Sequence, residues 1–495
     1  MKRIKAIFGM AFALIFGSVH LSAAEKLESL LPGYLANSTE LQQLANQMQK
    51  VMIENEMNEI SNGFSFKLST GTITFTTGDS WNIKFTPTAS FSIPDAKNLG
   101  ISVSSTILFD SSDSTDTFTN SSLKVSVDII SNNTKNREIN AMKSQRKILE
   151  AQRKVQNGFV SVEKEFYENV KSLYEMASKI LTLEKSLYDN QLKLETLKSQ
   201  GYTTSSTKYK TAQMNVMNDQ YDVDSQMKSM EREVKIFCAK CGVEYKYDSP
   251  LSFLPTEIPD VEAVKITSYS PEKYTKIESL TWTHYINELE RETDSSISLS
   301  ANAGFTFNNE RTSSHSIDLG SNFTWNDTGL VLNVGTNIPV GTDSFSPVFT
   351  LGVSFDPTAF KTAKLNKELD SLESSQEEID IENAKSDFGT VAITQNTSLE
   401  NIMWEKSTCK ESYEMYSSLE ADMAKYYRQG YISKTEYNNA SVNKETSRIK
   451  VLINKLNLII YNNETTLLFV RDEELREDKS NQDVNSEKGE SNDVK

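Results

Sequence analysis

The chain has 495 residues, enough for two or three ordinary domains, but only 37% of them are hydrophobic, less than is usual for a globular protein. With 52 Lys and Arg against 68 Asp and Glu, the net charge of −16 argues against binding to nucleic acid or to anionic lipid. The few His and Cys residues, three of each, and the lack of a GxxxxGK[ST] or GxGxxG phosphate loop argue against an enzyme. We therefore expect no catalytic residue, no cofactor and no metal.

Residues 1–24 have the three parts of a secretory signal peptide. Lys2 and Arg3 precede a mostly apolar run over 6–19, and small residues follow at 22–24. A short membrane anchor is the alternative, but this run is shorter than the roughly 20 residues that cross a bilayer. Further along, no run of 18 apolar residues occurs, so a membrane segment of the mature chain would have to be a β-barrel.

The next part of the chain predicts a helix over 27–60 and then a block of strands over 64–130. Apolar residues occupy every second position in this block, as in Leu123, Val125 and Val127. This alternation gives a strand two unlike faces, which both a soluble sandwich and a lipid-facing barrel require, and the secreted context favours the barrel. The strands are expected near 64–76, 81–93, 100–109 and 117–130.

A helix of about 65 residues is expected over 135–199. At 1.5 Å per residue it would be nearly 100 Å long, so it must pack against neighbours along its whole length. Its apolar residues indicate a coiled-coil seam, with a repeat of seven at Phe159, Phe166, Leu173, Ile180, Leu187 and Leu194.

This helix ends in a bend at 200–206, where Gly201 is suited to a position that needs a positive φ. A return helix is expected over 207–240, which completes a helical hairpin over 135–241 and a first repeat over 25–246. The segment 242–264 contains three Pro and is interpreted as a linker.

The second half predicts the same order of elements, in a second repeat over 247–470. Ser270 and Pro271 open a lead-in helix. The helical hairpin 358–470 bends at 429–434, and the tail 471–495 is expected to be disordered. The strand block 296–356 is expected to hold four strands, near 296–308, 314–325, 329–340 and 346–356.

An offset of 229 residues superposes the two halves and indicates an internal duplication. Without a gap it places Phe159 on Phe388 and Leu173 on Ile402, and it aligns the two bends. The aligned tripeptides at the bends are Gln200-Gly201-Tyr202 and Gln429-Gly430-Tyr431.

Together, the signal peptide, the duplicated strand block with its helical hairpin and the paired bends resemble the TolC-like outer-membrane efflux factor family. The resemblance implies an α+β membrane protein in which long α-helical coiled-coil hairpins join antiparallel β-strands. Strands from a homotrimer would close one transmembrane β-barrel in the outer-membrane lipid, and the helices would form a tunnel in the periplasm. The implied function is a passive conduit for efflux or type I secretion, with a periplasmic adaptor and an inner-membrane pump of the RND or ABC type as partners.

In that family the bends form the periplasmic entrance, and adaptors dock beside them. The resemblance makes Glu436 the first member of an acidic gate pair whose second position holds Asn439. It also makes Tyr427 a latch residue, although Ile432 replaces its Arg partner. A solvated helix charge is the alternative for Glu436, and hydrophobic packing in the bend is the expected role of the two bend tyrosines.

The strand count departs from the family, which has two long strands in each repeat. The first and last predicted strands of each block take the family's positions beside the helices. The middle hairpins could form extracellular extensions or could enlarge the barrel, and we favour extensions.

The remaining candidates for chemistry are a few Cys and His residues. Cys238 and Cys241 could close a local disulfide or stay as thiols, and a zinc site would need two more ligands. Cys409 lies on a helical seam, as a small buried residue would. His284 and His315 stand in contexts that do not support a catalytic triad.

A structural or adhesive envelope protein with a coiled-coil stalk and surface-exposed strands is the alternative function. The duct interpretation requires the two bends to lie at the same end of the molecule. The exported substrate is not determined by the sequence.

Overall fold

In a computed structural model, the protein is described over residues 27–76, 82–94, 97–110, 118–293, 297–308, 315–341 and 346–470. These residues form two compact units. Unit 1 comprises residues up to 47, 151–277 and those from 385 onwards, and unit 2 comprises 48–150 and 278–384. The predicted signal peptide and polar tail lie outside the described residues. No helix in the described part is both long and apolar enough to cross a membrane.

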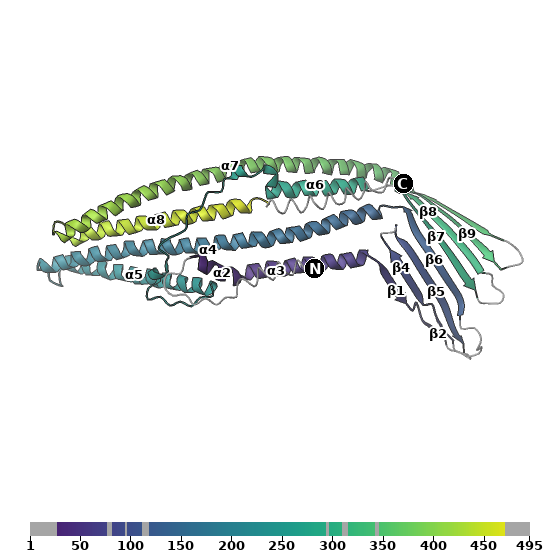
Figure 1. Ribbon diagram of the computed structural model, residues 1–495, viewed down its shortest axis with the longest axis horizontal. Coiled ribbons are helices and arrows are strands. Elements are labelled where there is room, and N and C mark those ends of the chain that lie inside the picture. Colours follow the sequence, from purple (N-terminus) through teal and green to yellow (C-terminus); the bar gives the residue numbers. More distant parts are fainter. Residues whose placement is uncertain are drawn as a thin grey trace. The chain divides into compact units, whose positions relative to one another are not determined.

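The helices follow the predicted order in both halves (Figure 1). The first half contains α2 (Leu27–Ala36), α3 (Thr39–Asn62), α4 (Asn133–Ser199) and α5 (Thr207–Lys240). The second half contains α6 (Thr275–Thr293), α7 (Pro357–Arg428) and α8 (Lys434–Leu467), with short 3-10 turns η1 (Pro250–Phe253), η2 (Ile266–Ser268), η3 (Pro271–Lys273) and η4 (Asn326–Thr328). The predicted fold class is confirmed in its long helical hairpins, its antiparallel strands and its duplicated order.

The first lead-in helix is interrupted, where the sequence predicted one continuous helix over 27–60. Ser38 stands between α2 and α3, and its hydroxyl accepts a hydrogen bond from the backbone N–H of Leu41 at 3.3 Å. A serine that caps the following turn in this way favours a new helix start over continuation.

All ten strands of the described part form one antiparallel sheet in unit 2 (Figure 1). The main path runs β1-β4-β5-β6-β7-β8-β9-β10, and β6 pairs with β7, so the two repeats share the sheet. The strands are β1 (Ser65–Ser69), β2 (Thr74–Thr76), β3 (Asn82–Phe85), β4 (Thr88–Ile93), β5 (Leu99–Asp110), β6 (Phe118–Ile130), β7 (Ile297–Asn308), β8 (His315–Trp325), β9 (Leu330–Val340) and β10 (Val348–Phe355).

The first two predicted strands are each broken in two. Gly71 has a φ of +65° between β1 and β2, and a Cβ there would lie 2.4 Å from the carbonyl oxygen of Thr86. Pro87 separates β3 from β4, because proline has no N–H to donate to the ladder. In the second block, all four predicted strands are found within two residues of their expected bounds.

The extra strands widen the sheet, so our preference for extracellular extensions was wrong. β8 and β9 pair with each other over their whole lengths and stand side by side between β7 and β10. Each extra strand exchanges backbone hydrogen bonds with neighbours on both sides, which leaves fewer edge groups unpaired than a projecting hairpin would.

The sheet has one apolar face and one polar face, because side chains alternate along each strand. The pairing register aligns apolar residues of neighbouring strands, as in the row Val103, Leu123, Phe305 and Ile317. Small and polar residues fill the opposite face, where serine hydroxyls meet across strands, as in Ser104 and Ser122 at 2.7 Å.

The main core of unit 1 lies between the helices of the two hairpins. Phe166, Tyr174 and Ile180 of α4 are buried there with Met230 of α5 and Leu456 of α8. Phe166 and Ile180 belong to the predicted heptad seam, and Tyr174 adjoins it. The seven-residue spacing that predicted a coiled coil therefore arises because these side chains are buried on one face of α4.

The segment after α5 is packed against the helices of unit 1. Ile258 is buried, and its carbonyl oxygen accepts a hydrogen bond from Lys455 Nζ on α8 at 3.1 Å. Asn462 of α8 bonds the segment twice, to the Glu262 carbonyl at 2.8 Å and to the Val264 N–H at 2.9 Å. This linker therefore ties the second hairpin to the residues that follow the first.

Candidate functional site: the paired hairpin bends

The first bend is a helix C-terminus closed by its own backbone. Gly201 has a φ of +81°, and its N–H bonds to the carbonyl oxygen of Lys198 at 3.1 Å. The N–H of Tyr202 bonds to the carbonyl oxygen of Leu197, also at 3.1 Å. This pair of bonds is a Schellman motif, which satisfies carbonyl groups that a helix end otherwise leaves without partners.

The second bend repeats this geometry. Gly430 has a φ of +76°, its N–H bonds to Tyr427 O at 3.0 Å, and the N–H of Tyr431 bonds to Tyr426 O at 2.9 Å. Among the described residues, no atom lies within 4 Å of the place that a Cβ would take at either glycine, so the positive φ explains the choice of glycine at both bends. The aligned tripeptides thus have the same local structure, with Gln200 and Gln429 as the last residues before the glycines.

Glu436 begins α8 as part of a capping box. The Ser433 hydroxyl accepts from the Glu436 N–H at 3.2 Å, and the Glu436 carboxylate accepts from the Ser433 N–H at 2.8 Å. These hydrogen bonds, the backbone one foremost, hold the pKa of Glu436 below its usual value. The carboxylate is exposed and negatively charged, and its hydrogen bonds stabilise the start of α8.

The two other predicted gate residues are Tyr427, at the end of α7, and Asn439, near the start of α8. Tyr427 stacks on Tyr437 across the hairpin, with ring centres 5.5 Å apart and planes 6° apart. Asn439 is half-buried, and its Oδ1 has no hydrogen-bond partner in the described part of the chain. In this hairpin, Tyr427 therefore forms a stacked aromatic pair with Tyr437 in place of the polar latch that the family resemblance implies.

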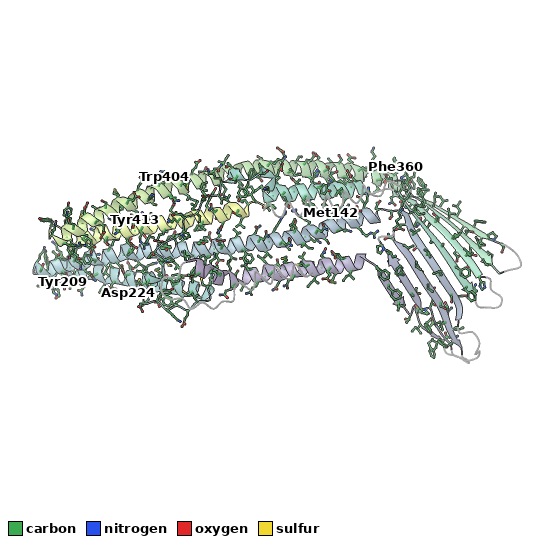
Figure 2. All side chains as sticks on the ribbon, in the orientation of Figure 1. Met142, Tyr209, Asp224, Phe360, Trp404 and Tyr413 are labelled. Carbon is green, nitrogen blue, oxygen red and sulfur yellow. The ribbon has the colours of Figure 1, made fainter. Side chains whose placement is uncertain are left out.

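The two bends lie at the same end of unit 1. Nζ of Lys434, at the start of α8, is 5.7 Å from the centre of the Tyr188 ring on α4. A groove of about 700 Å³ beside the first bend is lined by α4, α5 and Thr435 of the second hairpin. Tyr209, on the first turn of α5, marks this end in Figure 2. The arrangement that the duct interpretation requires is therefore present.

The two bend tyrosines differ from each other. Tyr202 has Lys208 Nζ 5.7 Å from its ring centre, whereas Tyr431 is 76% exposed. Hydrophobic packing in the bend, expected for both, is therefore wrong for Tyr431. A large exposed aromatic ring at a chain bend can contact another molecule.

Cys238 and Cys241 are buried thiols at the C-terminal end of α5. Both belong to the apolar core of unit 1, together with Phe237. Of the two alternatives that the sequence left open, the structure has the thiols and not the local disulfide. Cys409 is half-buried, and burial raises the pKa of its thiol.

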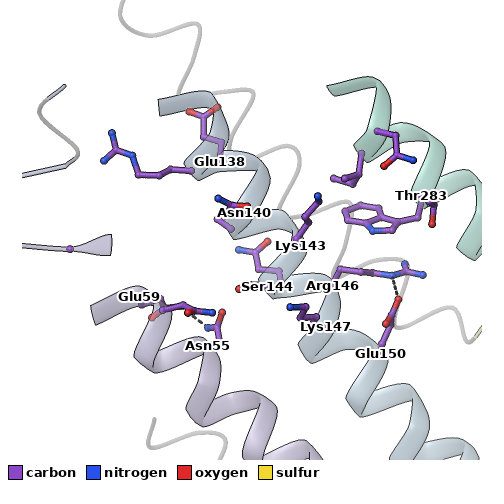
Figure 3. Close-up of a pocket in the computed structure, with 18 residues that line it drawn as sticks. Asn55, Glu59, Glu138, Asn140, Lys143, Ser144, Arg146, Lys147, Glu150 and Thr283 are labelled. Atoms are coloured by element: carbon purple, nitrogen blue, oxygen red, sulfur yellow. Dashed lines mark hydrogen bonds and ion pairs between the residues drawn. The ribbon is translucent and has the colours of Figure 1, made fainter. Parts of the chain in front are cut away.

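Unit 2 contains a groove of about 960 Å³ that is lined by α3, α4 and α6 (Figure 3). Arg146 is buried on its wall, where it bonds Glu150 at 3.0 Å and forms an ion pair with Glu278. Its guanidinium carbon is 5.2 Å from the centre of the Trp282 ring. The contacts with Glu278 and Trp282 join α4 to α6, and the bond to Glu150 orients the guanidinium, so Arg146 has a structural explanation.

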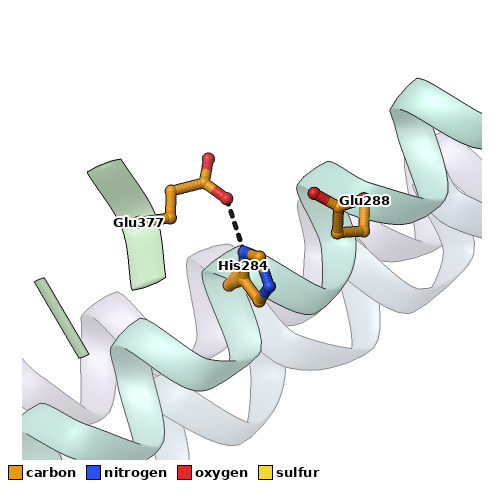
Figure 4. Close-up of side chains that lie close together, drawn as sticks. All are labelled: His284, Glu288 and Glu377. Carbon is orange, nitrogen blue, oxygen red and sulfur yellow. Dashed lines mark hydrogen bonds and ion pairs between the residues drawn. The ribbon is translucent and has the colours of Figure 1, made fainter. Parts of the chain in front are cut away.

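Sequence reasoning missed a polar cluster between α6 and α7 (Figure 4). Glu377 accepts from His284 Nδ1 at 2.8 Å, from Asn287 at 2.7 Å and from Arg291 at 2.8 Å. Burial alone would raise the pKa of Glu377, but these bonds, with Arg291 foremost, lower it to about 2. The spacing of seven from His284 to Arg291 places both on one helix face, but it does not reveal the partner on α7.

This cluster has the donor atoms of a metal site, since one atom each of His284, Glu288 and Glu377 lies within 4.8 Å of the others. However, Arg291 bonds both carboxylates, at 2.7 Å to Glu288 and 2.8 Å to Glu377. A guanidinium in that position neutralises the acids and repels a cation, so the cluster is explained as an ion-pair network.

Comparison with known families identifies both halves of the chain. Residues 30–258 match the TP096X N-terminal domain, and residues 259–472 match the TP096X C-terminal domain. The two matches are consecutive and together cover most of the chain. The chain belongs to the TP096X family. The boundary between its two TP096X domains falls within the packed linker, after Ile258.

No curated protein matches this TP096X chain. Among solved structures it is similar to the outer membrane protein VceC from Vibrio cholerae, at 11% identity over 90% of this chain and 96% of that one, with a TM-score of 0.48. It is also similar to the CmeC outer membrane channel of Campylobacter jejuni, at 11% identity over 94% and 93% of the two chains, again with a TM-score of 0.48.

Proposed function

We propose that this TP096X chain is one subunit of a passive export duct, an outer-membrane channel-tunnel component of a tripartite efflux or type I secretion system. The observation that carries the proposal is that unit 2 has two edges, each made of an exposed apolar strand continuous with an exposed apolar helix. Such edges are suited to pairing with further copies of the same chain.

The first edge is formed by α3 and β1. Ile53, Met57 and Ile60 of α3 are each more than half exposed and recur at spacings of four and three, which puts them on one helix face. β1 is an edge strand of the sheet, and its Phe66 and Leu68 are 60% and 70% exposed. One side of unit 2 thus presents a continuous apolar margin.

The second edge is formed by β10 and α7. β10 is the other end of the sheet path, and every residue in it is exposed, including Leu351. In the following helix Leu365, Leu369 and Leu372 repeat the same spacing of four and three, all more than half exposed. The margin at this end is likewise made of an edge strand and a helix with an apolar stripe, but in the opposite chain order.

Two unlike edges on one molecule make a head-to-tail interface, which closes into a ring when the rotation between copies allows it. An open edge strand with apolar residues is otherwise prone to aggregation, so natural proteins cover it or pair it. We propose a homotrimer, the assembly implied by the resemblance to TolC-like factors. In that ring the apolar face of the sheet would contact outer-membrane lipid, and the polar face would line the passage.

The helical part would then lie in the periplasm, with the paired bends as the entrance. Tyr431, exposed at the second bend, is suited to contact with a periplasmic adaptor, and Glu436 is suited to act on charged solutes as a gate. No catalytic residue is needed in this account, because an inner-membrane pump of the RND or ABC type would supply the energy.

Labelling of an introduced cysteine, measured against the background of the three native thiols Cys238, Cys241 and Cys409 in the unsubstituted chain, tests the orientation. Ser206→Cys and Lys434→Cys place thiols at the two bends, and both should resist a membrane-impermeant maleimide in intact cells and react after the outer membrane is permeabilised. Thr328→Cys, in the turn between β8 and β9, is a control that measures the labelling of a position away from the bends. Labelling of both bends in intact cells would favour a structural or adhesive envelope protein and would contradict the duct.

A further inference from the structure

The sheet of unit 2 has eight strand positions side by side (Figure 1). The broken strand β1-β2 fills the first position and the broken strand β3-β4 fills the second, since β1 pairs with β4 and β2 pairs with β3. β5 to β10 fill the other six positions. One row of the polar face crosses all eight, and it reads Ser65, Ser92, Gly100, Ser126, Asn302, Gly320, Gly335 and Thr350.

An even number of positions lets the sheet continue into further copies of itself. Every pair of neighbouring strands in the described sheet is antiparallel, so β1 and β10, in the first and eighth positions, run in opposite directions. When β10 of one copy lies beside β1 of the next, the antiparallel ladder therefore continues across the junction. Three copies of eight positions, as in the proposed homotrimer, make a ring of 24 strands.

The number of strands sets the width of such a ring. Strands lie about 4.8 Å apart and tilt by about 40° in a closed sheet, so 24 of them form a ring about 48 Å across. The inner side chains take up about 5 Å on each side, half of the distance between stacked sheets, which leaves about 38 Å clear. Four positions in each copy, two from each repeat, would leave only about 14 Å by the same geometry.

The residues of the polar face keep this width open. The row that crosses the sheet contains only Ser, Gly, Asn and Thr, and a second row adds Ser104, Ser122 and Thr306. The charged residues of this face in the described strands are three lysines and three aspartates, namely Lys67, Lys84, Lys124, Asp110, Asp128 and Asp318. Since these charges cancel, we expect the passage to select solutes by size more than by charge.

The helices of unit 2 agree with a wide ring. Helices α3 and α4 line one groove, Arg146 of α4 pairs with Glu278 of α6, and Glu377 of α7 bonds His284 of α6, so the four follow one another in the order α3, α4, α6, α7. At 8–10 Å between neighbouring axes, four helices take up about 32–40 Å of a ring. Eight strands take up about 38 Å, whereas four would take up only about 19 Å. The eight-stranded sheet therefore matches the helices in breadth.

We propose that the sheet part of the duct is wide enough for macromolecular cargo, and that the substrate class of this chain is polypeptides that keep folded structure. A domain of 100 residues has a radius of gyration of about 13 Å and is therefore about 34 Å across, which is within the clear width. This inference rests on the proposed duct, in which the polar face of the sheet lines the passage.

Labelling of a cysteine on the polar face by reagents of two sizes tests the width. Ser126→Cys and Asn302→Cys each place a thiol in the row that crosses the sheet, at exposed positions. The assembled protein in detergent is treated with N-ethylmaleimide or with a maleimide polymer about 25 Å across, a size between the two clear widths. The polymer should label both variants within several-fold of its rate at Lys246→Cys, an exposed position in the linker, once labelling of the native thiols is subtracted.

The outcomes separate the width from the duct. Labelling of the assembled protein by N-ethylmaleimide but not by the polymer would overturn the wide passage and leave the duct in place. If neither reagent labelled either variant while Lys246→Cys reacted, the polar face would not line a passage, and the duct would fail together with its width.

Electron microscopy of the assembled protein measures the ring without any substitution. The ring of strands should be about 48 Å across, and a ring of half that diameter would overturn the proposal. Deletion of the β8-β9 hairpin, His315–Val340, joins Asn308 of β7 to Val348 of β10 at the same end of the sheet and leaves six positions. It should narrow the ring by about a quarter, because the diameter grows with the number of strands. An unchanged diameter in this variant would contradict the assignment of β8 and β9 to the ring.

Discussion

At the scale of single residues, the capping box of Ser433 and Glu436 explains why α8 starts where it does. The equivalent residue of the first hairpin, Ser206, makes no side-chain cap. The two hairpins therefore differ in one local feature, which gives a matched pair of substitutions.

Ser433→Ala should loosen the first turn of α8 by about 1 kcal/mol, the usual contribution of an N-cap. Hydrogen exchange of the Glu436 amide should become several-fold faster, because its bond to the Ser433 hydroxyl is lost. Ser206→Ala should have little effect on the first turn of α5. Equal acceleration at both helix starts would contradict the assignment of the cap.

The Glu377 network predicts a dependence of stability on pH. Its bonds to Arg291, His284 and Asn287 lower the pKa of Glu377 to about 2, below the value of about 4.3 in an unfolded chain. The bonds of the carboxylate therefore stabilise the fold above that unfolded value, and their contribution is lost as pH falls from about 5 to 2.

Thermal unfolding at intervals between pH 6 and pH 2 measures this effect. The wild type should lose more stability over this range than Glu377→Gln, which cannot be ionised. Glu378→Gln, one residue further along α7, is the matched control and should follow the wild type. Identical pH profiles for Glu377→Gln and the wild type would rule out the network as the source.

At the scale of elements, glycine has opposite roles at two kinds of position in the helices. Gly201 ends α4 with a φ of +81°, whereas Gly389 lies inside α7 with open space around its missing Cβ. Gly201→Ala should therefore destabilise the protein by about 1 kcal/mol, since αL costs a residue with a Cβ roughly that much. Gly389→Ala should stabilise it by about 0.5–1 kcal/mol, because glycine is unfavourable inside a helix.

Chemical denaturation of the full chain compares the free energies of unfolding of the two variants. The same sign of change in both would contradict the assignment of the bend glycine. Gly430→Ala provides a replicate at the second bend and should behave as Gly201→Ala.

Periodicity predicted the elements well wherever one face of an element is buried. The return helix α5 has the predicted bounds, and the strands of the second block lie within two residues of theirs. The split strands of the first block were missed because Gly71 and Pro87 act through backbone geometry, which leaves the alternation of apolar residues intact. The duplication and the bends were predicted because equal spacing and glycine are visible along the chain.

The sequence did not predict which elements contact each other across long separations. Glu377 and His284 are 93 positions apart, and no local pattern joins them. The pairing of β6 with β7 and the widening of the sheet by β8 and β9 also depend on partners distant in the chain.

At the scale of the whole molecule, the two apolar edges of unit 2 lead to the proposed ring. Met57→Glu on α3 and Leu369→Glu on α7 place charges in the middle of the two apolar stripes. Each should weaken assembly while leaving the fold of the chain intact, because both side chains are exposed in the single chain. Circular dichroism checks the fold, and sedimentation checks assembly.

A charge elsewhere on the surface is the control for these variants. Trp404→Glu is the control variant, because Trp404 is 68% exposed and lies on the part of α7 that belongs to unit 1 (Figure 2). If its replacement by Glu disrupted assembly and the two edge variants did not, the association surface would be in unit 1 and the edges would be unexplained.

The native mass of the protein, measured by mass spectrometry from detergent, tests the central claim most directly. The account predicts three copies of the chain, and lower order for Met57→Glu and Leu369→Glu. A stable single chain in mild detergent, with its β1 and β10 edges free, would contradict it.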